Sequence, residues 1–206
     1  MITNPEIERY LYGLLPPRDE VLAEMEVQAA ERKIPIVGPA VGSLLAVLVR
    51  ASGAKRIFEL GSAIGYSTIW LARAAGTGAE VHYSDADPRN AEEARSYFER
   101  AGLSSKIHIH VGDAFGSLAS VSGDFDVVFN DIDKEQYPEV LAVAPGRLRS
   151  GGLLITDNSL WHERVLEPAD ATSRAVCDFN RNTFNNIDLF SVIVPLRDGL
   201  TLSVKR

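Results

Sequence analysis

The fold of this chain is decided by the stretch FDVVFNDIDK at residues 125–134. It begins as an almost continuous apolar run, which is typical of a strand that helices cover on both faces. A second run, LLITDN at residues 153–158, has the same form. In both, acidic side chains stand where a buried strand ends, and ligands of open α/β sheets bind at the carboxyl ends of the strands. Hard oxygen ligands at two such ends, with a lysine three residues after the first aspartate, indicate a divalent-metal site.

Strand-like and helix-like segments alternate from residue 56 onward. The predicted strands are 56–60, 80–85, 106–111, 125–130, 153–156, 187–194 and 200–204, and the predicted helices between them are 67–75, 88–101, 137–148 and 173–184. Repeated strand–helix units predict parallel strands with right-handed crossovers and helices on both faces. The turn signal Arg197-Asp198-Gly199 makes the last two strands antiparallel. We therefore predict a doubly wound, seven-stranded mixed α/β sheet with one antiparallel strand near the edge. Gly151-Gly152 is expected to break the third helix.

Length and charge limit the classes of protein to which this chain can belong. The 206 residues suffice for one sizeable core, and we expect one domain, with helices in 1–55 and the sheet core in 56–206. The net charge of −7 and the lack of a basic run argue against nucleic acid or an anionic membrane as partner. The longest apolar stretch, residues 41–49, is too short to span a bilayer, and the N-terminus lacks a signal-peptide pattern. We expect a cytoplasmic protein.

The first strand–helix turn is typical of a nucleotide site without a pyrophosphate. It is FELGSAIGYS at residues 58–67, and Ala63 stands where the dinucleotide fingerprint needs a second glycine. An uncharged or cationic nucleoside fits this turn better. Asp85, at the end of the second strand, is placed to accept hydrogen bonds from a ribose diol, and Asp113 could face an adenine edge. Both carboxylates could instead cap helices, and Gly61 and Gly65 could serve only the turn.

The motifs together resemble those of the cation-dependent class I O-methyltransferases, the family of caffeoyl-CoA and catechol O-methyltransferases and their bacterial relatives. They are Glu-Leu-Gly-x-x-x-Gly-Tyr-Ser at 59–67, an acidic second strand end, Asp-x-x-Lys at 131–134 and Asp-Asn at 157–158. The segments IPIVGP (34–39), DNSLW (157–161) and PLRDGLTL (195–202) are similar as well, so the resemblance covers nearly the whole chain. It implies a Rossmann-like fold, a single methyltransferase domain over 1–206, and S-adenosylmethionine as methyl donor.

The resemblance also implies roles for individual residues. Asp131, Asp157 and Asn158 would be the ligands of a divalent cation, most simply Mg²⁺. Asp131 and Lys134 would be catalytic, with Lys134 taking the proton from the attacking hydroxyl. Trp161 would line the pocket of a small aromatic, catechol-like acceptor. The residues implied to bind the methyl donor are Val37, Glu59, Gly61, Ala63, Ser67, Asp85, Asp113, Ala114 and Asp131. Relatives are commonly dimers, so a homodimer is expected.

Other interpretations of these residues stay open. Asp131 and Asp157 could be helix caps or ion-pair partners, and Lys134 could be a solvated residue of a first helical turn. Trp161 could serve packing alone. Asp133 is a first-turn charge with a reserve role as a ligand. The stretch 162–164, His-Glu-Arg, stands where the family often has a glycine-containing segment, which leaves the acceptor open.

Two other functions are compatible with such a sheet. An NAD(P)-dependent oxidoreductase would need the pyrophosphate-binding glycine pattern that this chain lacks. A non-catalytic nucleoside-binding protein of the same fold would show no metal-dependent turnover. A zinc site is not expected, because His82, His108 and His110 lie on predicted strands and have no zinc-type spacing.

Overall fold

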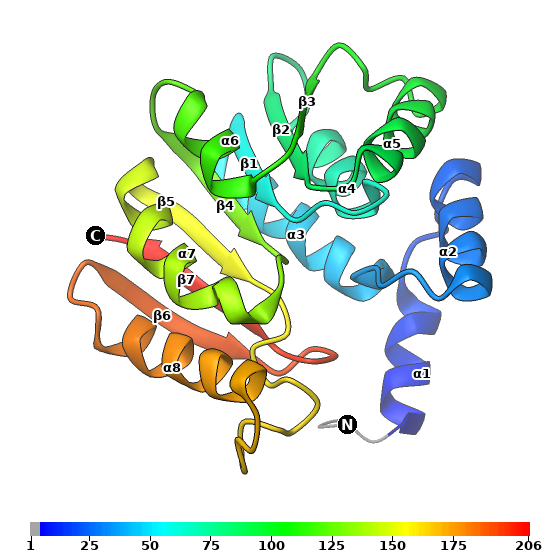
Figure 1. Cartoon of the computed structure of the whole chain (residues 1–206). Helices are drawn as coiled ribbons and strands as arrows, with labels where there is room; N and C mark the ends of the chain where they lie inside the picture. The colour runs from blue at the N-terminus through cyan, green and yellow to red at the C-terminus, as the bar shows by residue number, and fades with distance from the viewer. Residues whose placement is uncertain (1–4) are drawn as a thin grey trace.

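A seven-stranded sheet forms the centre of the computed structural model, which describes residues 5–206 (Figure 1). Its strands are β1 (Arg56–Leu60), β2 (Glu80–Asp85), β3 (Ile107–Val111), β4 (Phe125–Asn130), β5 (Leu148–Thr156), β6 (Leu189–Val194) and β7 (Leu200–Lys205). Their order is β3-β2-β1-β4-β5-β7-β6. Only β7 among these strands is antiparallel to its neighbours, β5 and the edge strand β6. The predicted mixed α/β sheet is therefore confirmed.

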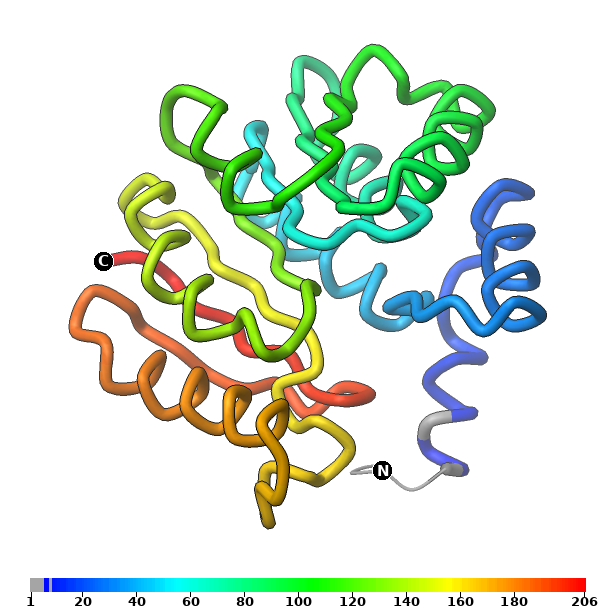
Figure 2. The backbone as a smooth tube through the Cα atoms, in the orientation of Figure 1, coloured from blue at the N-terminus to red at the C-terminus, as the bar shows by residue number. Residues whose placement is uncertain are grey.

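Helices cover both faces of the sheet. They are α1 (Pro5–Leu14), α2 (Glu20–Arg32), α3 (Gly38–Ser52), α4 (Tyr66–Ala75), α5 (Pro88–Arg100), α6 (Ala114–Ser120), α7 (Tyr137–Val143) and α8 (Ala171–Asn185). Two short 3₁₀ turns, Lys134–Gln136 and Ala144–Arg147, flank α7. Figure 2 shows α1 and α2 on the side of the molecule away from α7 and α8. No helix in the described part of the chain is long and apolar enough to cross a membrane.

Alternate residues of each central strand enter two separate apolar cores. On β1, Ile57 packs into a core with side chains of α2–α5, whereas Phe58 and Leu60 pack into a core with side chains of α6–α8. All three side chains have no exposed surface. Successive side chains of a strand point to opposite faces, and each fully buried one contributes about 1.5–3 kcal/mol. The double core explains why apolar side chains occupy both faces of these strands rather than one face only.

The strand order reverses between β1 and β4, which creates the crevice of a doubly wound sheet. Leu60 is in register with Asn130, and Asn130 with Thr156, so the three strands end at one level. The next residues join across the same edge, because Asp131 donates its N–H to the Leu60 carbonyl (2.9 Å) and Asp157 donates to the Asn130 carbonyl (3.0 Å). The two acidic strand ends identified in the sequence are therefore neighbours.

The expected helix break at Gly151-Gly152 is wrong. Helix α7 already ends at Val143, a 3₁₀ turn containing Pro145 follows, and β5 begins at Leu148, before both glycines. A Cβ at Gly152 would lie 2.8 Å from the Arg149 carbonyl oxygen, and the register between β4 and β5 shifts here. The glycines thus permit an irregular first half of β5. The periodicity of the sequence does not distinguish glycines that permit an irregular strand from glycines that end a helix.

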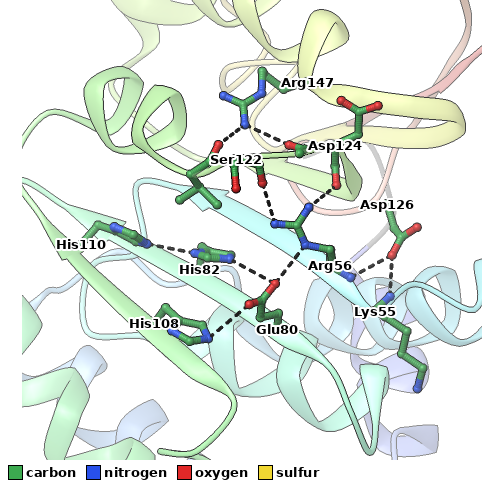
Figure 3. A network of polar contacts seen from close by, with 12 residues as sticks. Lys55, Arg56, Glu80, His82, His108, His110, Ser122, Asp124, Asp126 and Arg147 are labelled. Carbon is green, nitrogen blue, oxygen red and sulfur yellow. Dashed lines mark hydrogen bonds and ion pairs between the residues drawn. The ribbon is translucent and has the colours of Figure 1, made fainter.

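A network of histidines occupies β2 and β3, away from the strand ends (Figure 3). His82 Nδ1 lies 2.9 Å from His110 Nε2, and the His82 ring stacks on the His108 ring with 5.0 Å between centroids. Glu80, held by Arg56 Nε at 2.9 Å, faces His82 and His108. Burial lowers the pKa of His82 to about 4, and the neighbouring histidines act in the same direction. Within the described residues, no group of three or more His, Cys, Asp or Glu is arranged to hold a metal ion.

Candidate functional site

A cleft of about 1320 Å³ opens at the carboxyl ends of the parallel strands. The predicted site residues that line it are Gly61, Ala63, Asp85, Asp113, Ala114, Asp131, Lys134, Asp157, Asn158 and Trp161. Val37 and Ser67 line a small adjoining recess. Glu59 is fully buried and lines neither space. The tertiary structure thus gathers nearly all of these residues, which are spread along the sequence from Val37 to Trp161, around one cleft.

The ends of β4 and β5, with the loops that follow them, form what we call the metal half of the cleft. Here Lys134 Nζ donates to Asp131 Oδ1 (2.9 Å) and to the Ile132 carbonyl (3.1 Å). Lys134 and Asp157 are 9% and 5% exposed, so the alternative of a solvated lysine is not what the structure shows. Burial raises the pKa of both Asp131 and Asp157, and the charge of Asp131 raises that of Asp157 further. Two carboxylates that desolvation destabilises as anions are suited to a cation.

Asn158 adds a neutral oxygen to these carboxylates. Its backbone is left-handed (φ 53°), and its Nδ2 donates to Asp198 Oδ2 (3.2 Å). The amide nitrogen is therefore engaged, and the amide oxygen is the atom left for a ligand. Mg²⁺ prefers oxygen ligands and usually keeps several waters, so two carboxylates and one amide oxygen fit such an ion.

The ends of β1, β2 and β3 form what we call the donor half. Asp85 accepts hydrogen bonds from the backbone N–H groups of Ala63 and Asp87 (both 2.9 Å) and from Asn90 Nδ2 (3.0 Å). Asp113 accepts from the Gly116 N–H (2.5 Å) and caps α6. Both carboxylates line the cleft. Asp113 therefore caps a helix, as the sequence left open, whereas Asp87 and not Asp85 is the N-cap of α5.

Glu59 lies below the donor half with an incomplete set of partners. Thr68 donates to Glu59 Oε2, and the hydroxyls of Ser62 and Ser67 also stabilise its anionic form. Glu59 Oε1 is buried and has no hydrogen-bond partner. Burial raises the pKa of Glu59 to about 7, and the charge of Asp131 adds to the shift. Because Glu59 lines neither the cleft nor the recess, its role in binding the methyl donor stays a prediction.

Gly61 connects the two halves. Its φ is +78°, and a Cβ on it would lie 2.8 Å from the Asp131 carbonyl oxygen and 2.9 Å from Ile132 Cα. The glycine is required because the first turn crosses the backbone after β4. The sequence had assigned this freedom to the approach of a nucleotide.

The acceptor side of the cleft is formed by the loop after β5. The Trp161 ring centroid lies 5.7 Å from Lys134 Nζ, so an aromatic face is next to the proposed base. Trp161, His162 and Glu163 all have left-handed backbones. His162 is solvent-exposed, with a side chain 73% exposed. The indole Nε1 is buried without a partner.

Tyr137 and Asp198 were not singled out in the sequence, whereas the hairpin near Arg197 was expected to help shape the acceptor pocket. Tyr137 donates its hydroxyl to the Asp157 carbonyl (2.7 Å), and Arg197 and Asp198 line the cleft from the turn between β6 and β7. The position of this turn follows from the topology of the sheet. Because β6 runs parallel to β1–β5, its carboxyl end and the turn after it reach the same edge of the sheet. Tyr137 carried no signal beyond helical spacing.

The cleft is strongly acidic. Its lining residues include ten acidic side chains and two from Lys or Arg: Glu26, Asp85, Asp87, Asp113, Asp131, Asp133, Glu135, Asp157, Glu163 and Asp198, against Lys134 and Arg197. Negative charge concentrated in a cleft attracts cationic ligands. A divalent cation and a sulfonium both have the required sign.

The family model for O-methyltransferases matches residues 17–206. Curated relatives include a catechol O-methyltransferase of Niastella koreensis, 35% identical over 96% of each chain. A catechol O-methyltransferase of Mycobacterium tuberculosis is 32% identical over 81% of this chain and 77% of its own. The chain therefore belongs to the O-methyltransferase family.

Solved structures agree with this assignment. The O-methyltransferase of Bacillus cereus, in complex with S-adenosylhomocysteine, is 28% identical, with a TM-score of 0.89 over 98% of this chain and 97% of its own. The Streptomyces achromogenes O-methyltransferase TomG, in complex with S-adenosylmethionine, is 30% identical, with a TM-score of 0.89 over 97% and 96%. The Rossmann-like methyltransferase fold extends over nearly the whole chain.

Proposed function

We propose that this protein transfers a methyl group from S-adenosylmethionine to a hydroxyl of a catechol-like or other small aromatic acceptor, with the help of a divalent cation. The observation that carries the proposal is the joining of two half-sites in one cleft. The donor half has the carboxylates of Asp85, at the end of β2, and Asp113, after β3, and the metal half has Asp131, Asp157 and the Asn158 oxygen beside Lys134. The family match and the catechol O-methyltransferase relatives support the reaction and the acceptor class.

The chemistry is an in-line displacement. The acceptor oxygen forms a bond to the methyl carbon while the carbon–sulfur bond breaks, and the sulfur keeps the electron pair as S-adenosylhomocysteine leaves. Lys134, in its neutral form, accepts the hydroxyl proton at Nζ; two contacts, to Asp131 and to the Ile132 carbonyl, hold this atom in place. A divalent cation, when bound, would polarise the acceptor hydroxyl and lower its pKa. Fixing the two reacting atoms can supply roughly 7–11 kcal/mol.

The test is methyl transfer from radiolabelled S-adenosylmethionine to catechols, hydroxycinnamates and flavonoids, with Mg²⁺ and with EDTA. We expect turnover of at least one catechol with Mg²⁺ and its loss with EDTA. Undiminished turnover in EDTA would remove the cation from the proposal but leave the methyl transfer. No turnover of any aromatic hydroxyl would reject the acceptor class.

The oxidoreductase alternative is not favoured by the family match or by the relatives. Differential scanning fluorimetry separates it from our proposal. We expect S-adenosylhomocysteine to raise the melting temperature and NAD(P)H to leave it unchanged. The non-catalytic alternative also predicts binding of S-adenosylhomocysteine, but no methyl transfer. Turnover in the methyl-transfer assay would therefore exclude this alternative.

We also infer that the whole chain acts as one methyltransferase domain and as a homodimer. The N-terminal helices contribute to the cleft through Glu26, whose carboxylate accepts a hydrogen bond from the Tyr66 hydroxyl (2.7 Å). A candidate dimer surface lies on the edge strand, where Phe190 and Val192 are 68% and 51% exposed next to Val204. Light scattering on the purified protein tests the dimer, and a monomer at micromolar concentration would contradict it. The cytoplasmic location stays a prediction, to be checked by fractionation of the host cells.

A further inference from the structure

Asp198 lies in the turn between β6 and β7 and reaches into the metal half of the cleft. Its side chain is 13% exposed, and both carboxylate oxygens are engaged. Oδ2 accepts a hydrogen bond from Asn158 Nδ2 (3.2 Å), and Oδ1 accepts one from the backbone N–H of His162 (2.6 Å). Both donors belong to the loop that follows β5. Asp198 therefore connects the metal-ligand end of that loop to its acceptor end.

The contact with Asp198 determines which atom of Asn158 faces the cleft. An ionised carboxylate only accepts hydrogen bonds, whereas a side-chain amide has a donating nitrogen and an accepting oxygen. The amide must therefore present its NH₂ group to Asp198 and its oxygen elsewhere. The opposite orientation would place two acceptors against each other. Asp198 thus determines that the amide oxygen of Asn158, and not its nitrogen, is the atom available beside Asp131 and Asp157.

The turn that holds Asp198 is itself fixed in place. Ser159 and Leu160 donate their N–H groups to the carbonyls of Gly199 and Asp198 (both 2.9 Å). A Cβ on Gly199 would lie 2.5 Å from Leu160, so the turn and the loop are in close contact. On its other side, Arg197 Nη1 donates to the carbonyls of Ile36 and Val37. Backbone contacts on both sides leave little freedom to the Asp198 carboxylate.

We propose that Asp198 is a positioning residue that orients the Asn158 amide oxygen toward the divalent cation and fixes the turn carrying Trp161 and His162. The inference rests on the proposed function, because it takes Asn158 as a metal ligand. Residues that hydrogen-bond a metal ligand are worth about 10- to 100-fold in metal affinity. Asp198 supplies such a contact from a part of the chain 40 residues away from Asn158.

The variant Asp198→Asn tests this with almost no change in shape. Its side chain has one accepting oxygen, so it can satisfy Asn158 or the His162 N–H but not both. We expect the Kd for Mn²⁺, measured by electron paramagnetic resonance of the free ion, to rise about 10- to 100-fold. The Kd for S-adenosylhomocysteine should stay within about twofold of wild type, because the donor half is untouched. The matched control is Asp188→Asn, an exposed aspartate before β6, which should change neither constant.

Loss of a negative charge could itself weaken metal binding, and a double-mutant cycle separates that effect. In an Asn158→Ala background there is no amide to orient, so Asp198→Asn should have almost no further effect on the Mn²⁺ Kd. An equal effect in both backgrounds would show that Asp198 acts through its charge, and the proposal would be overturned. The reference must be the variant Asn158→Ala measured in the same buffer, since the two sites are in contact.

The remaining outcomes distinguish this inference from the function on which it rests. If wild type binds Mn²⁺ and Asp198→Asn binds it equally well, only the role of Asp198 is rejected. If wild type binds no Mn²⁺, the cation of the proposed function and this inference both fail. Should Asp198→Asn not fold, exchange of the Asn158 side-chain NH₂ protons in wild type gives a second measurement. Protection from exchange is expected, and exchange as fast as that of a solvated amide would contradict the proposal.

Discussion

The two halves of the cleft use the same residue type in opposite ways. In the donor half, Asp85 and Asp113 already have hydrogen bonds from backbone N–H groups, one of which comes to Asp85 from Ala63 in the turn after β1. In the metal half, desolvation raises the pKa of Asp131 and Asp157; Lys134 is the main group that opposes it at Asp131, and the Asn158 N–H is the main one at Asp157. The donor half is stable as it stands and offers its remaining lone pairs to a ligand. The metal half has buried negative charge that a cation would stabilise, which teaches that strand ends in one sheet can be prepared for different ligands.

The largest expected effect comes from removing a carboxylate of the metal half. Asp131→Ala should lower kcat/KM for a catechol by at least about a thousandfold, because loss of the cation and of the Lys134 contact removes about 4 kcal/mol of transition-state stabilisation. Steady-state methyl transfer measures this loss. The Kd for S-adenosylhomocysteine serves as the control and should change only a few-fold. A variant as active as wild type would break the distinction between the halves.

The next effect isolates the proton acceptor within the metal half. Lys134→Met should lower kcat about a hundredfold, as is usual for loss of a general base, without weakening Mn²⁺ binding. Lys106→Met, on the turn before β3, is the matched control and should keep wild-type kcat. A fall in Mn²⁺ affinity that accounts for the whole loss of activity would assign Lys134 to the metal site and not to proton transfer.

The histidine network of β2 and β3 is a third region. Its titration should affect the stability of the fold and can be measured apart from pH effects on the cleft. His82 has a folded-state pKa of about 4, below its ordinary value of 6.5, so below pH 6.5 the unfolded chain takes up a proton that the folded chain does not. The contribution of neutral His82 to the free energy of unfolding is therefore fully present above pH 6.5 and is lost as the pH falls toward 4. The free energy of unfolding should drop by about 2 kcal/mol between pH 7 and pH 5 from this group.

Urea unfolding at several pH values measures that drop. In His82→Gln the part of the drop due to this group should disappear, whereas His162→Gln, at an exposed position, should keep it. The comparison uses the slope with pH, because His82→Gln also changes stability through packing against Phe58. An identical slope in wild type and His82→Gln would show that the buried histidine is not the acid-sensitive group.

The smallest effect is expected in the donor half. Asp85→Asn keeps the shape but cannot accept all the hydrogen bonds that Ala63, Asp87 and Asn90 donate. Asp85 is proposed to accept hydrogen bonds from the ribose hydroxyls, and the loss of one such bond to a charged group costs about 1.5 kcal/mol, so the Kd for S-adenosylhomocysteine should rise about tenfold. Calorimetry measures it, and the Mn²⁺ Kd should not change. A larger effect on Mn²⁺ than on S-adenosylhomocysteine would mean that the halves are not independent.

Much of the fold could be predicted because each central strand is a short apolar run followed by a turn. β1, β2 and β4 have the predicted bounds. The start of β5 was wrong, since Gly151-Gly152 are typical of a helix end and only the neighbouring backbone of Arg149 and Asp126 shows why they are glycines. Lys134, for which the first turn of a helix was one of the alternatives, lies on a 3₁₀ turn. Local sequence does not distinguish these cases, because both turns use the same residues.

The candidate site divides in the same way. The order of motifs predicted which strand ends carry Asp85, Asp131 and Asp157, and the topology of parallel strands brings these ends to one edge. Asp198 was not singled out, although the direction of β6 places its turn at that edge. Tyr137 could not have been found, because its contact with the Asp157 carbonyl depends on how the loop after β4 packs against β5.

The sequence by itself determined the alternation of strands and helices, the residue types at the strand ends and the acidic balance of the chain. Those properties are local or additive, so they can be deduced from composition and period. Only the tertiary structure decided that Glu59 Oε1 has no partner, that Lys134 is buried against Asp131, and that Asp198 accepts a hydrogen bond from the Asn158 amide. The physical reason is that desolvation and hydrogen-bond pairing depend on which groups meet in space, and a linear order of residues does not contain those distances.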